Sequence, residues 1–143
     1  MAQIISDLKS KGKKIIHCHG VFDLLHIGHI KHFKEAKTFG DILIVGLNSN
    51  KSVKSIKSKD RPINSENDRA YLLAALESVD YVVIFDEDTP LEAMTVLEPD
   101  IIVKGGDYTF DTVVGNHLAE VVIFPTVEGH STSATIKKID NSN

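Results

Sequence analysis

The sequence has little of several residues that mark specialised classes of protein. Its single cysteine, Cys18, cannot form an internal disulfide, so we expect a reducing, cytoplasmic setting. No apolar run approaches the roughly 18 residues that cross a bilayer, and residues 1–14 lack the unbroken apolar stretch of a signal peptide. Tryptophan is absent, aromatic residues make up 6% of the chain, and no stacking motif accompanies its basic residues. We therefore expect no membrane partner and no nucleic-acid partner.

What is present is the composition of one globular domain, which we predict over residues 1–143. The 143 residues are 42% hydrophobic and 25% charged, enough for one core of ordinary size. Charge is divided unevenly, because residues 1–61 hold 12 Lys and Arg against 5 Asp and Glu, whereas residues 62–143 hold 4 against 15. Either the surface is unevenly charged or the first half faces an anion, and composition does not decide between the two.

Apolar runs alternate with helical spacings along the chain. Short β-branched runs predict strands at residues 13–18, 41–47, 80–85, 100–104 and 120–124. Helical spacing and capping residues predict helices at 2–11, 25–39, 65–76, 89–97 and 131–139, a weaker helix through 117, and a polar loop at 48–64. This alternation predicts an α/β fold: a single doubly wound, Rossmann-like domain with a five-stranded parallel sheet. Its ligand should bind beyond the carboxyl ends of the strands.

The segment after the first predicted strand is the most informative. His26 and His29 are three residues apart at a helix start, so both rings can lie on one side of the first turn. Gly28 between them lets a ligand approach the backbone. Because the N–H groups and dipole of a helix N-terminus favour phosphate, and imidazoles add donors, the segment predicts a phosphate site.

The local density of histidine raises an alternative, a zinc site. Five histidines lie within 16 residues: His17, His19, His26, His29 and His32. Against zinc, no cysteine or acidic residue completes a ligand spacing, and His17, inside a strand, is expected to point away from His19. We predict no dedicated metal site, and a metal-binding or nucleotide-binding module without turnover remains the non-enzymatic hypothesis.

Three other segments fall at predicted strand ends. The basic residues within 51–61 form either a solvated loop or a source of one lysine that folds over a triphosphate. Gly105 and Gly106 suit an ordinary turn or the close approach of a ligand. The hydroxyls of Ser131 and Thr132 suit a helix cap, and they can also donate to phosphate.

Together these segments resemble the nucleotidyltransferase superfamily whose first motif is H-x-G-H, the cytidylyltransferase-like enzymes, over about residues 13–139. Within it the sequence is most similar to the heptose 1-phosphate adenylyltransferases. The resemblance rests on Phe22-Asp23-Leu24-Leu25-His26, Asn48-Ser49, Arg61-Pro62-Ile63-Asn64 and residues 74–80, 87–90 and 99–108.

The resemblance implies that a sugar-phosphate oxygen attacks the α-phosphate of a nucleoside triphosphate and releases pyrophosphate. The implied reactants are ATP and D-glycero-D-manno-heptose 1-phosphate, in lipopolysaccharide synthesis. The alternative is a CTP-dependent cytidylyltransferase acting on glycerol 3-phosphate or another polyol or amino-alcohol phosphate. Since a phosphate monoester, with a second pKa of about 6, is already anionic at pH 7, the reaction needs no catalytic serine, cysteine or strong base. Positioning and charge neutralisation suffice.

Roles follow for the matching residues. The resemblance implies that His26 and His29 hold the phosphates and stabilise the transition state, while Lys57 or, failing that, Lys54 neutralises the reacting phosphates. Ser131 and Thr132 would bind the β/γ end of the triphosphate. The remaining expected nucleotide-binding residues are Gly20, Phe22, Asp23, Gly28, Arg69, Gly105 and Asp107. Mg²⁺ would bridge the phosphates, and relatives are commonly homodimers and are often fused to a sugar kinase domain.

The sequence departs from the family pattern at several positions. His19-Gly20-Val21 stands where the heptose enzymes usually have Asn-Gly-Cys, and it is closer to the choline- and ethanolamine-phosphate cytidylyltransferases. The arginine of their Arg-Thr-Glu-Gly motif is Thr126 here, and the usual Lys-Gly of the mobile loop is Lys57-Ser58. These departures leave open the nucleotide base and the choice of catalytic lysine.

Overall fold

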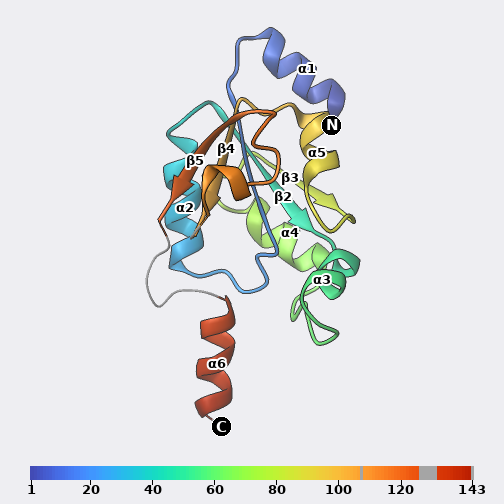
Figure 1. Cartoon of the computed structure of the whole chain (residues 1–143), viewed down its shortest axis with the longest axis vertical. Helices are drawn as coiled ribbons and strands as arrows, with labels where there is room; N and C mark the ends of the chain where they lie inside the picture. Colours follow the sequence, from blue (N-terminus) through green and yellow to red (C-terminus); the bar gives the residue numbers. More distant parts are fainter. Residues whose placement is uncertain (107, 126–131, 143) are drawn as a thin grey trace.

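The computed structural model describes residues 1–106, 108–125 and 132–142, and its elements follow the predicted alternation (Figure 1). The strands are β1 (Ile15–Gly20), β2 (Ile42–Asn48), β3 (Tyr81–Phe85), β4 (Ile101–Gly105) and β5 (Glu120–Phe124). The helices are α1 (Ala2–Ser10), α2 (Ile27–Lys37), α3 (Asn50–Ile56), α4 (Glu66–Ala74), α5 (Leu91–Leu97) and α6 (Thr132–Ser142), with a 3₁₀ turn at Phe110–Thr112.

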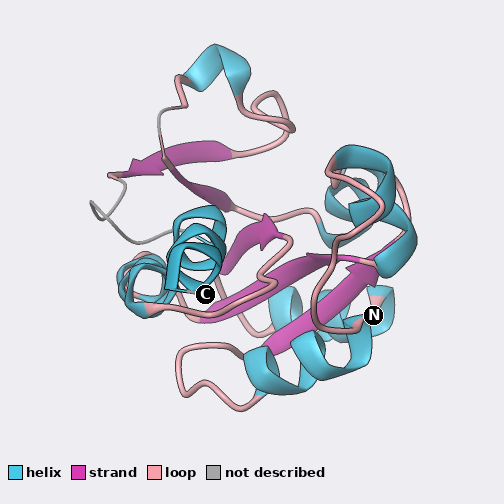
Figure 2. Cartoon of the chain, turned by 90° about the horizontal axis from the view of Figure 1, so that it is seen from below, coloured by secondary structure: helices cyan, strands magenta, loops and turns pink. Residues whose placement is uncertain are grey.

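The strands form one sheet in the order β3-β2-β1-β4-β5, and every pairing is parallel. Helices lie on both sides of this sheet, as Figure 2 shows. The predicted fold class, a doubly wound α/β domain with a five-stranded parallel sheet, is therefore confirmed. The chain moves outward from β1 to β3 and then returns to the other side of β1 with β4. This reversal opens a crevice at the carboxyl ends of β1 and β4.

The strands hold together because both of their faces are buried. The largest apolar cluster takes side chains from the central strands and the helices over them, including Ile16, Leu43, Val45 and Phe33, none more than 1% exposed. Burial of such runs on both faces is what a parallel sheet requires. Helices that return the chain between parallel strands complete this burial.

Aspartates fix the beginnings of the inner strands. The backbone N–H of Ile15 donates to Asp100, that of Leu43 donates to Asp80, and that of Lys14 donates to Asp41, each at 2.8 Å. Each carboxylate thus satisfies a donor at the start of the neighbouring strand, which would otherwise lack a partner. Part of the acidic charge of the second half therefore has a structural use.

The predicted polar loop at residues 48–64 is wrong in its first half, which forms α3. The Ser49 hydroxyl accepts a hydrogen bond from the Ser52 N–H at 3.1 Å and caps this helix. Ser52 and Val53 form the buried face of this helix, and the Asn48 side chain donates to the Ser52 hydroxyl at 2.9 Å. A polar sequence becomes helical here because tertiary contacts hold one face of a short segment.

Two further expectations are corrected. The predicted helix through residue 117 is only the 3₁₀ turn at Phe110–Thr112, and Gly115 shortly after it has a φ of +82° that no α-helix continues through. Strand β1 extends through Gly20 instead of breaking at His19. His17 and His19 therefore share one face of the strand, with ring centroids 5.6 Å apart, against the prediction that they point apart.

The close approach of β1 and β2 predicts that Gly46→Ala is destabilising. A Cβ at Gly46 would lie 2.8 Å from His17 Nε2 and 3.3 Å from His19 Cβ, inside a buried strand. Overpacking of this kind costs about 1–3 kcal/mol. Urea unfolding should show this loss, whereas Lys34→Ala on the exposed face of α2 should leave the midpoint nearly unchanged. An unaltered midpoint for Gly46→Ala would contradict the packing described.

Candidate phosphate-binding site

A cavity of about 430 Å³ lies at the carboxyl ends of the strands, where the topology places the ligand crevice. Its walls come from the ends of β1, β2 and β4, from the N-terminal turn of α2, and from the segments after α3 and β3. The lining residues are His19, Gly20, Val21, Phe22, His29, Asn48, Ile56, Lys57, Arg61, Asp88, Thr89, Pro90, Lys104, Tyr108 and Val114. Four predicted site residues are among them: Gly20, Phe22, His29 and Lys57.

The two histidines of the H-x-G-H motif are held by the backbone of their own helix. His26 is the N-cap of α2, and its Nδ1 accepts a hydrogen bond from the Gly28 N–H at 3.1 Å. His29 Nδ1 in turn accepts from the His26 N–H at 3.3 Å. The rings stack with centroids 3.8 Å apart, so the predicted pairing of both rings beside the first turn is what the structure shows.

This capping arrangement fixes the proton on each ring. Because Nδ1 accepts from a backbone N–H, the neutral imidazole carries its hydrogen on Nε2, the atom on the far side of the ring. Burial, followed by the proximity of His26 and His32, lowers the pKa of His29 to about 4. At neutral pH the His29 ring is therefore an uncharged donor. It can bond a phosphate oxygen without exchanging a proton with water.

Phe22 forms a wall between the strand and the histidines. It has a φ of +47°, which is rare for a bulky residue, and its ring lies over Gly20 and meets the His29 ring edge-on at 5.2 Å. A Cβ at Gly20 would lie 2.9 Å from the tip of the Phe22 ring, so only glycine leaves room for this packing. Gly20 and Phe22 together orient the His29 ring.

Asp23 is 1% exposed and serves the loop that follows α3. Its carboxylate accepts from Arg61 Nε, from the Ile63 N–H and from the Asn64 N–H, all at 2.8–2.9 Å. Burial alone would raise the pKa of this carboxyl, but the N–H groups of Asn64 and Ile63 and the Arg61 guanidinium outweigh it, and the net shift is downward. In this structure Asp23 acts on the site indirectly, because it fixes the loop that follows α3.

Arg69, which is expected to bind the nucleotide, is a second buried support and is not among the lining residues. The guanidinium is in a side chain only 1% exposed, and it donates to the carbonyls of Val21, Asn48 and Asn64 at 2.7–3.0 Å. Its other terminal nitrogen donates to Asn50 Oδ1 at 3.0 Å. One side chain thus joins the segments after β1 and β2 to the loop after α3, and it lies behind the cavity lining.

The structure distinguishes the candidate lysines by position. Lys57, at the C-terminus of α3, lines the cavity, whereas Lys54 is exposed and lies outside the lining. The lining also contains a cation that the prediction missed, Lys104 at the end of β4. The sequence contains a signal for Lys104. It directly follows three buried apolar residues of a strand, so it lies near the carboxyl end of that strand, where ligands bind in such sheets.

The other expected nucleotide-binding residues lie in α2, at the end of β4 and near the start of α6. Gly28 lies in the first turn of α2, and Gly105 is packed so closely by His32 that a Cβ would lie 2.9 Å from its Nδ1. Asp107 and Ser131 lie outside the described residues. Thr132 begins α6, and nothing about its side chain is described.

The five histidines do not gather into one ligand set. Two stacked pairs, His17 with His19 and His26 with His29, leave His32 with its ring edge against Phe124 at 5.5 Å. Within residues 1–106, 108–125 and 132–142, no group of three His, Cys, Asp or Glu side chains is arranged to hold a metal ion. Likewise, no described helix has both the length and the apolar character to cross a membrane.

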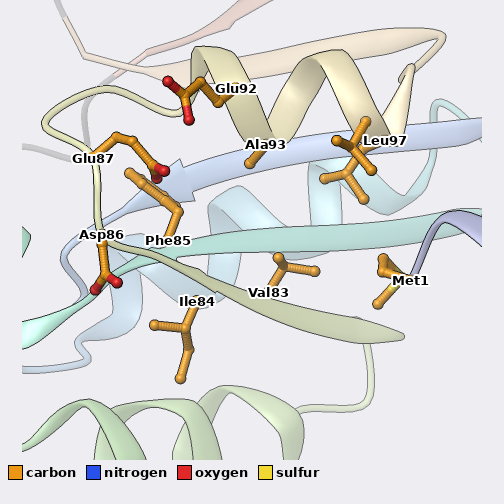
Figure 3. Close-up of a pocket in the computed structure, with 10 residues that line it drawn as sticks. Met1, Val83, Ile84, Phe85, Asp86, Glu87, Glu92, Ala93 and Leu97 are labelled. Atoms are coloured by element: carbon orange, nitrogen blue, oxygen red, sulfur yellow. The ribbon is translucent and has the colours of Figure 1, made fainter.

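A second cavity, of about 370 Å³, lies between β3 and α5, away from the histidines (Figure 3). Its floor is apolar, from Val83, Phe85 and Leu97, and Glu87 and Glu92 form an acidic rim. The pKa of Glu92 is raised, because its protonated carboxyl can donate a hydrogen bond to Glu87 and because the charge of Glu87 disfavours a second carboxylate beside it. An acidic rim of this kind is unfavourable for a phosphate, so the first cavity is the better candidate for a phosphate site.

The bonds of Asp23 predict how stability depends on pH. A carboxyl whose folded pKa lies below its unfolded value of about 3.9 stabilises the fold fully above that value, and the stabilisation is lost as pH falls through the folded pKa. Asp23→Asn should therefore cost about 1–3 kcal/mol at pH 7, and its unfolding free energy should fall less steeply between pH 5 and 3 than that of the wild type. If the unfolding free energies of the wild type and Asp23→Asn, measured with urea, fall in parallel over this pH range, the prediction is refuted. Asp111→Asn, at an exposed position, is the control.

Comparison with known proteins places this chain in a family. The cytidylyltransferase-like family model matches residues 17–142. The chain is 55% identical over 137 residues to bifunctional protein HldE of Nitratiruptor sp., covering 95% of this chain and 30% of that protein. It is 50% identical over 141 residues to bifunctional protein HldE of Aliarcobacter butzleri, covering 98% of this chain and 30% of that protein. The chain thus spans about a third of the length of these relatives.

Two solved structures have a fold similar to that of this chain. The lipopolysaccharide core biosynthesis protein of Thermoplasma volcanium is 30% identical with a TM-score of 0.67, over 81% of this chain and 98% of that one. The pantoate-beta-alanine ligase of Francisella tularensis, 20% identical with a TM-score of 0.64 over 95% of this chain and 70% of that one, shares the fold. On the family model, the close relatives and the shared fold together, the chain belongs to the cytidylyltransferase-like family of nucleotidyltransferases.

Proposed function

We propose that this domain transfers the adenylyl group of ATP to D-glycero-D-manno-heptose 1-phosphate, giving a nucleotide-sugar and pyrophosphate. The acceptor's phosphate oxygen forms the new bond to the α-phosphorus, and the bond from that phosphorus to the β-phosphate oxygen breaks. The names of the relatives, HldE and a lipopolysaccharide core biosynthesis protein, support a sugar of the cell envelope. A CTP-dependent transfer to a polyol phosphate is the competing outcome.

The observation that supports nucleotidyl transfer best is the stacked histidine pair. The pair caps α2, and the α2 N-terminus also contributes positive dipole potential where phosphates would lie. Donors held in place by the backbone need no reorganisation as negative charge shifts between phosphate oxygens in the transition state. His29 lines the cavity itself, and we assign His26 and His29 to the α-phosphate.

The charges around the cavity suit two anionic reactants. In the described part of the lining, Lys57, Arg61 and Lys104 supply three cations, against one carboxylate, Asp88. Arg61 is paired with Asp23, so Lys57 and Lys104 supply the cavity's uncommitted positive charge among the described residues. We assign Lys57 to the reacting phosphates, because it lines the cavity at the C-terminus of α3. The same proposal includes the other expected nucleotide contacts, which are Ser131, Thr132 and Asp107.

Mg²⁺ is expected to arrive with the triphosphate. The donor set fits this, because Asp88, the one carboxylate that lines the cavity among the residues that the structure describes, suits a cation held mainly by phosphate oxygens and water. When bound, the cation would neutralise phosphate charge. The chain's own residues would position the reactants and donate the hydrogen bonds.

We further propose that the domain works with a sugar kinase, which the word bifunctional in the relatives' names supports. A cytoplasmic location fits Cys18, which is buried and whose pKa burial raises, so that its thiol is unreactive. A homodimer is the assembly expected from the resemblance.

Pyrophosphate release across a panel of nucleotides and acceptors tests the function. ATP, CTP, GTP and UTP would each be combined with heptose 1-phosphate, glucose 1-phosphate and glycerol 3-phosphate. Turnover should be fastest with ATP and the heptose phosphate. Turnover with CTP and glycerol 3-phosphate, and none with ATP and heptose 1-phosphate, would overturn the proposal.

Substitution of His29 tests the donor that we assign to the phosphate. His29→Asn keeps an oxygen able to accept from the His26 N–H but removes the Nε2–H donor, so kcat should fall by on the order of 10²–10³-fold. His29→Ala, which also loses the cap, should fall at least as far. His117→Asn, at an exposed position, is the control, and unfolding curves verify that each variant folds. A His29→Asn enzyme within a few-fold of wild type would contradict the role.

A further inference from the structure

Lys104 is a cation without a carboxylate partner in the described part of the chain. The ion pairs found there join Lys9 to Glu98, Lys37 to Asp80 and Arg61 to Asp23, and none includes Lys104. The side chain is half-buried and lines the cavity at the end of β4. Burial lowers the pKa of its ammonium, and the nearby Lys57 lowers it further. A cation left in this condition is stabilised by any anion that enters the cavity.

Two neighbours hold the ammonium in place without neutralising it. Lys104 Nζ lies 3.3 Å from His19 Nε2 and 4.6 Å from the centroid of the Tyr108 ring. Neither group has a formal negative charge. They therefore orient the ammonium while leaving its charge available to a ligand.

His19 is suited to accept from a cation. Burial, followed by the proximity of Lys104, His17 and His32, lowers the pKa of His19 well below its usual range, so the ring is neutral. Because the ammonium can only donate, Nε2 must be the unprotonated acceptor and the ring proton lies on Nδ1. Stacking on His17, which is fully buried and whose pKa burial lowers to about 4, fixes the ring plane without adding a competing charge.

The location of this pair separates it from the groups already assigned. Lys57 belongs to the side of the cavity formed after β2 and α3, whereas Lys104 ends β4 on the opposite side of β1. The cavity between them includes His29. Nucleotidyl transfer brings two phosphate-bearing reactants together at one phosphorus, and their mutual repulsion requires fixed positive charge on more than one side.

We propose that Lys104 binds a phosphate group of one reactant and that His19 is its positioning residue, a neutral acceptor that aims the ammonium into the cavity. This inference rests on the proposed function. It assigns a role to His19. The heptose enzymes that this sequence resembles usually have asparagine at this position, which is also a neutral side chain with a hydrogen-bond acceptor.

Steady-state kinetics with ATP and heptose 1-phosphate test the assignment. Lys104→Met should raise the KM of one reactant by on the order of 10- to 100-fold, the range expected for a lost charge-assisted hydrogen bond. A rise confined to the heptose phosphate would place its phosphate at Lys104, and a rise confined to ATP would place the triphosphate there. Either result supports the proposal, and unchanged KM values for both reactants would overturn it.

The test of His19 has to separate a positioning role from a general loss of stability. His19→Gln places an oxygen acceptor near the position of Nε2, whereas His19→Leu has similar bulk and no acceptor. His19→Leu should raise the same KM as Lys104→Met, by about 3- to 30-fold, and His19→Gln should recover most of that loss. Equal KM values for the two His19 variants at equal unfolding midpoints would overturn the positioning role. Lys34→Met, on the exposed part of α2, is the matched control for loss of a lysine.

Calorimetric titration with MgATP and, separately, with glucose 1-phosphate distinguishes this proposal from the proposed function. If wild type shows no turnover with any reactant pair, the proposed function fails. Binding of a phosphate compound that weakens at least tenfold in Lys104→Met would still support the phosphate role of Lys104. Equal affinities in wild type and Lys104→Met for both compounds would remove it.

Discussion

The guanidinium of Arg69 has to be bonded on every side because it is buried, and the shape of the site follows from that requirement. A buried cation is tolerated only where acceptors surround it. Arg69 finds them in the carbonyls that end β1 and β2 and in the loop after α3. Asp23 receives the next donors of the same loop and binds Arg61. Three separate segments are thereby fixed at the carboxyl edge of the sheet, behind the cavity.

On this fixed edge the histidine pair needs little further support. The unpaired N–H groups at the beginning of α2 need acceptors, and the rings of His26 and His29 supply them. The same two bonds decide which ring nitrogen holds the proton, so helix capping and ligand chemistry are set by one arrangement. Phe22, held in a left-handed conformation over Gly20, then restrains the His29 ring from the side.

The sequence predicted the parts of the molecule that depend on local patterns. Five apolar runs predicted five strands, and β5 has the expected bounds, Glu120–Phe124. Local patterns failed where tertiary contacts decide. α3 lies in a segment too polar to predict as a helix, yet it is held by Ser49, Ser52 and Val53 against the sheet edge. The sequence pattern also predicts that His17 and His19 point apart, because His19-Gly20 resembles a strand end. In the structure β1 continues through Gly20, and this glycine makes room for the Phe22 ring without ending the strand.

The sequence by itself determined the alternation of strands and helices, the doubly wound parallel sheet, and a histidine motif at the first helix, because hydrophobic period and helix capping act over a few residues. Only the tertiary structure decided which cations reach the cavity. The ends of β2 and β4 are far apart in sequence, and the sheet places them on either side of β1. It selected Lys57 over Lys54 for the lining and added Lys104 and His19. Burial then set their electrostatics, because the loss of water around a charged group depends on the whole fold.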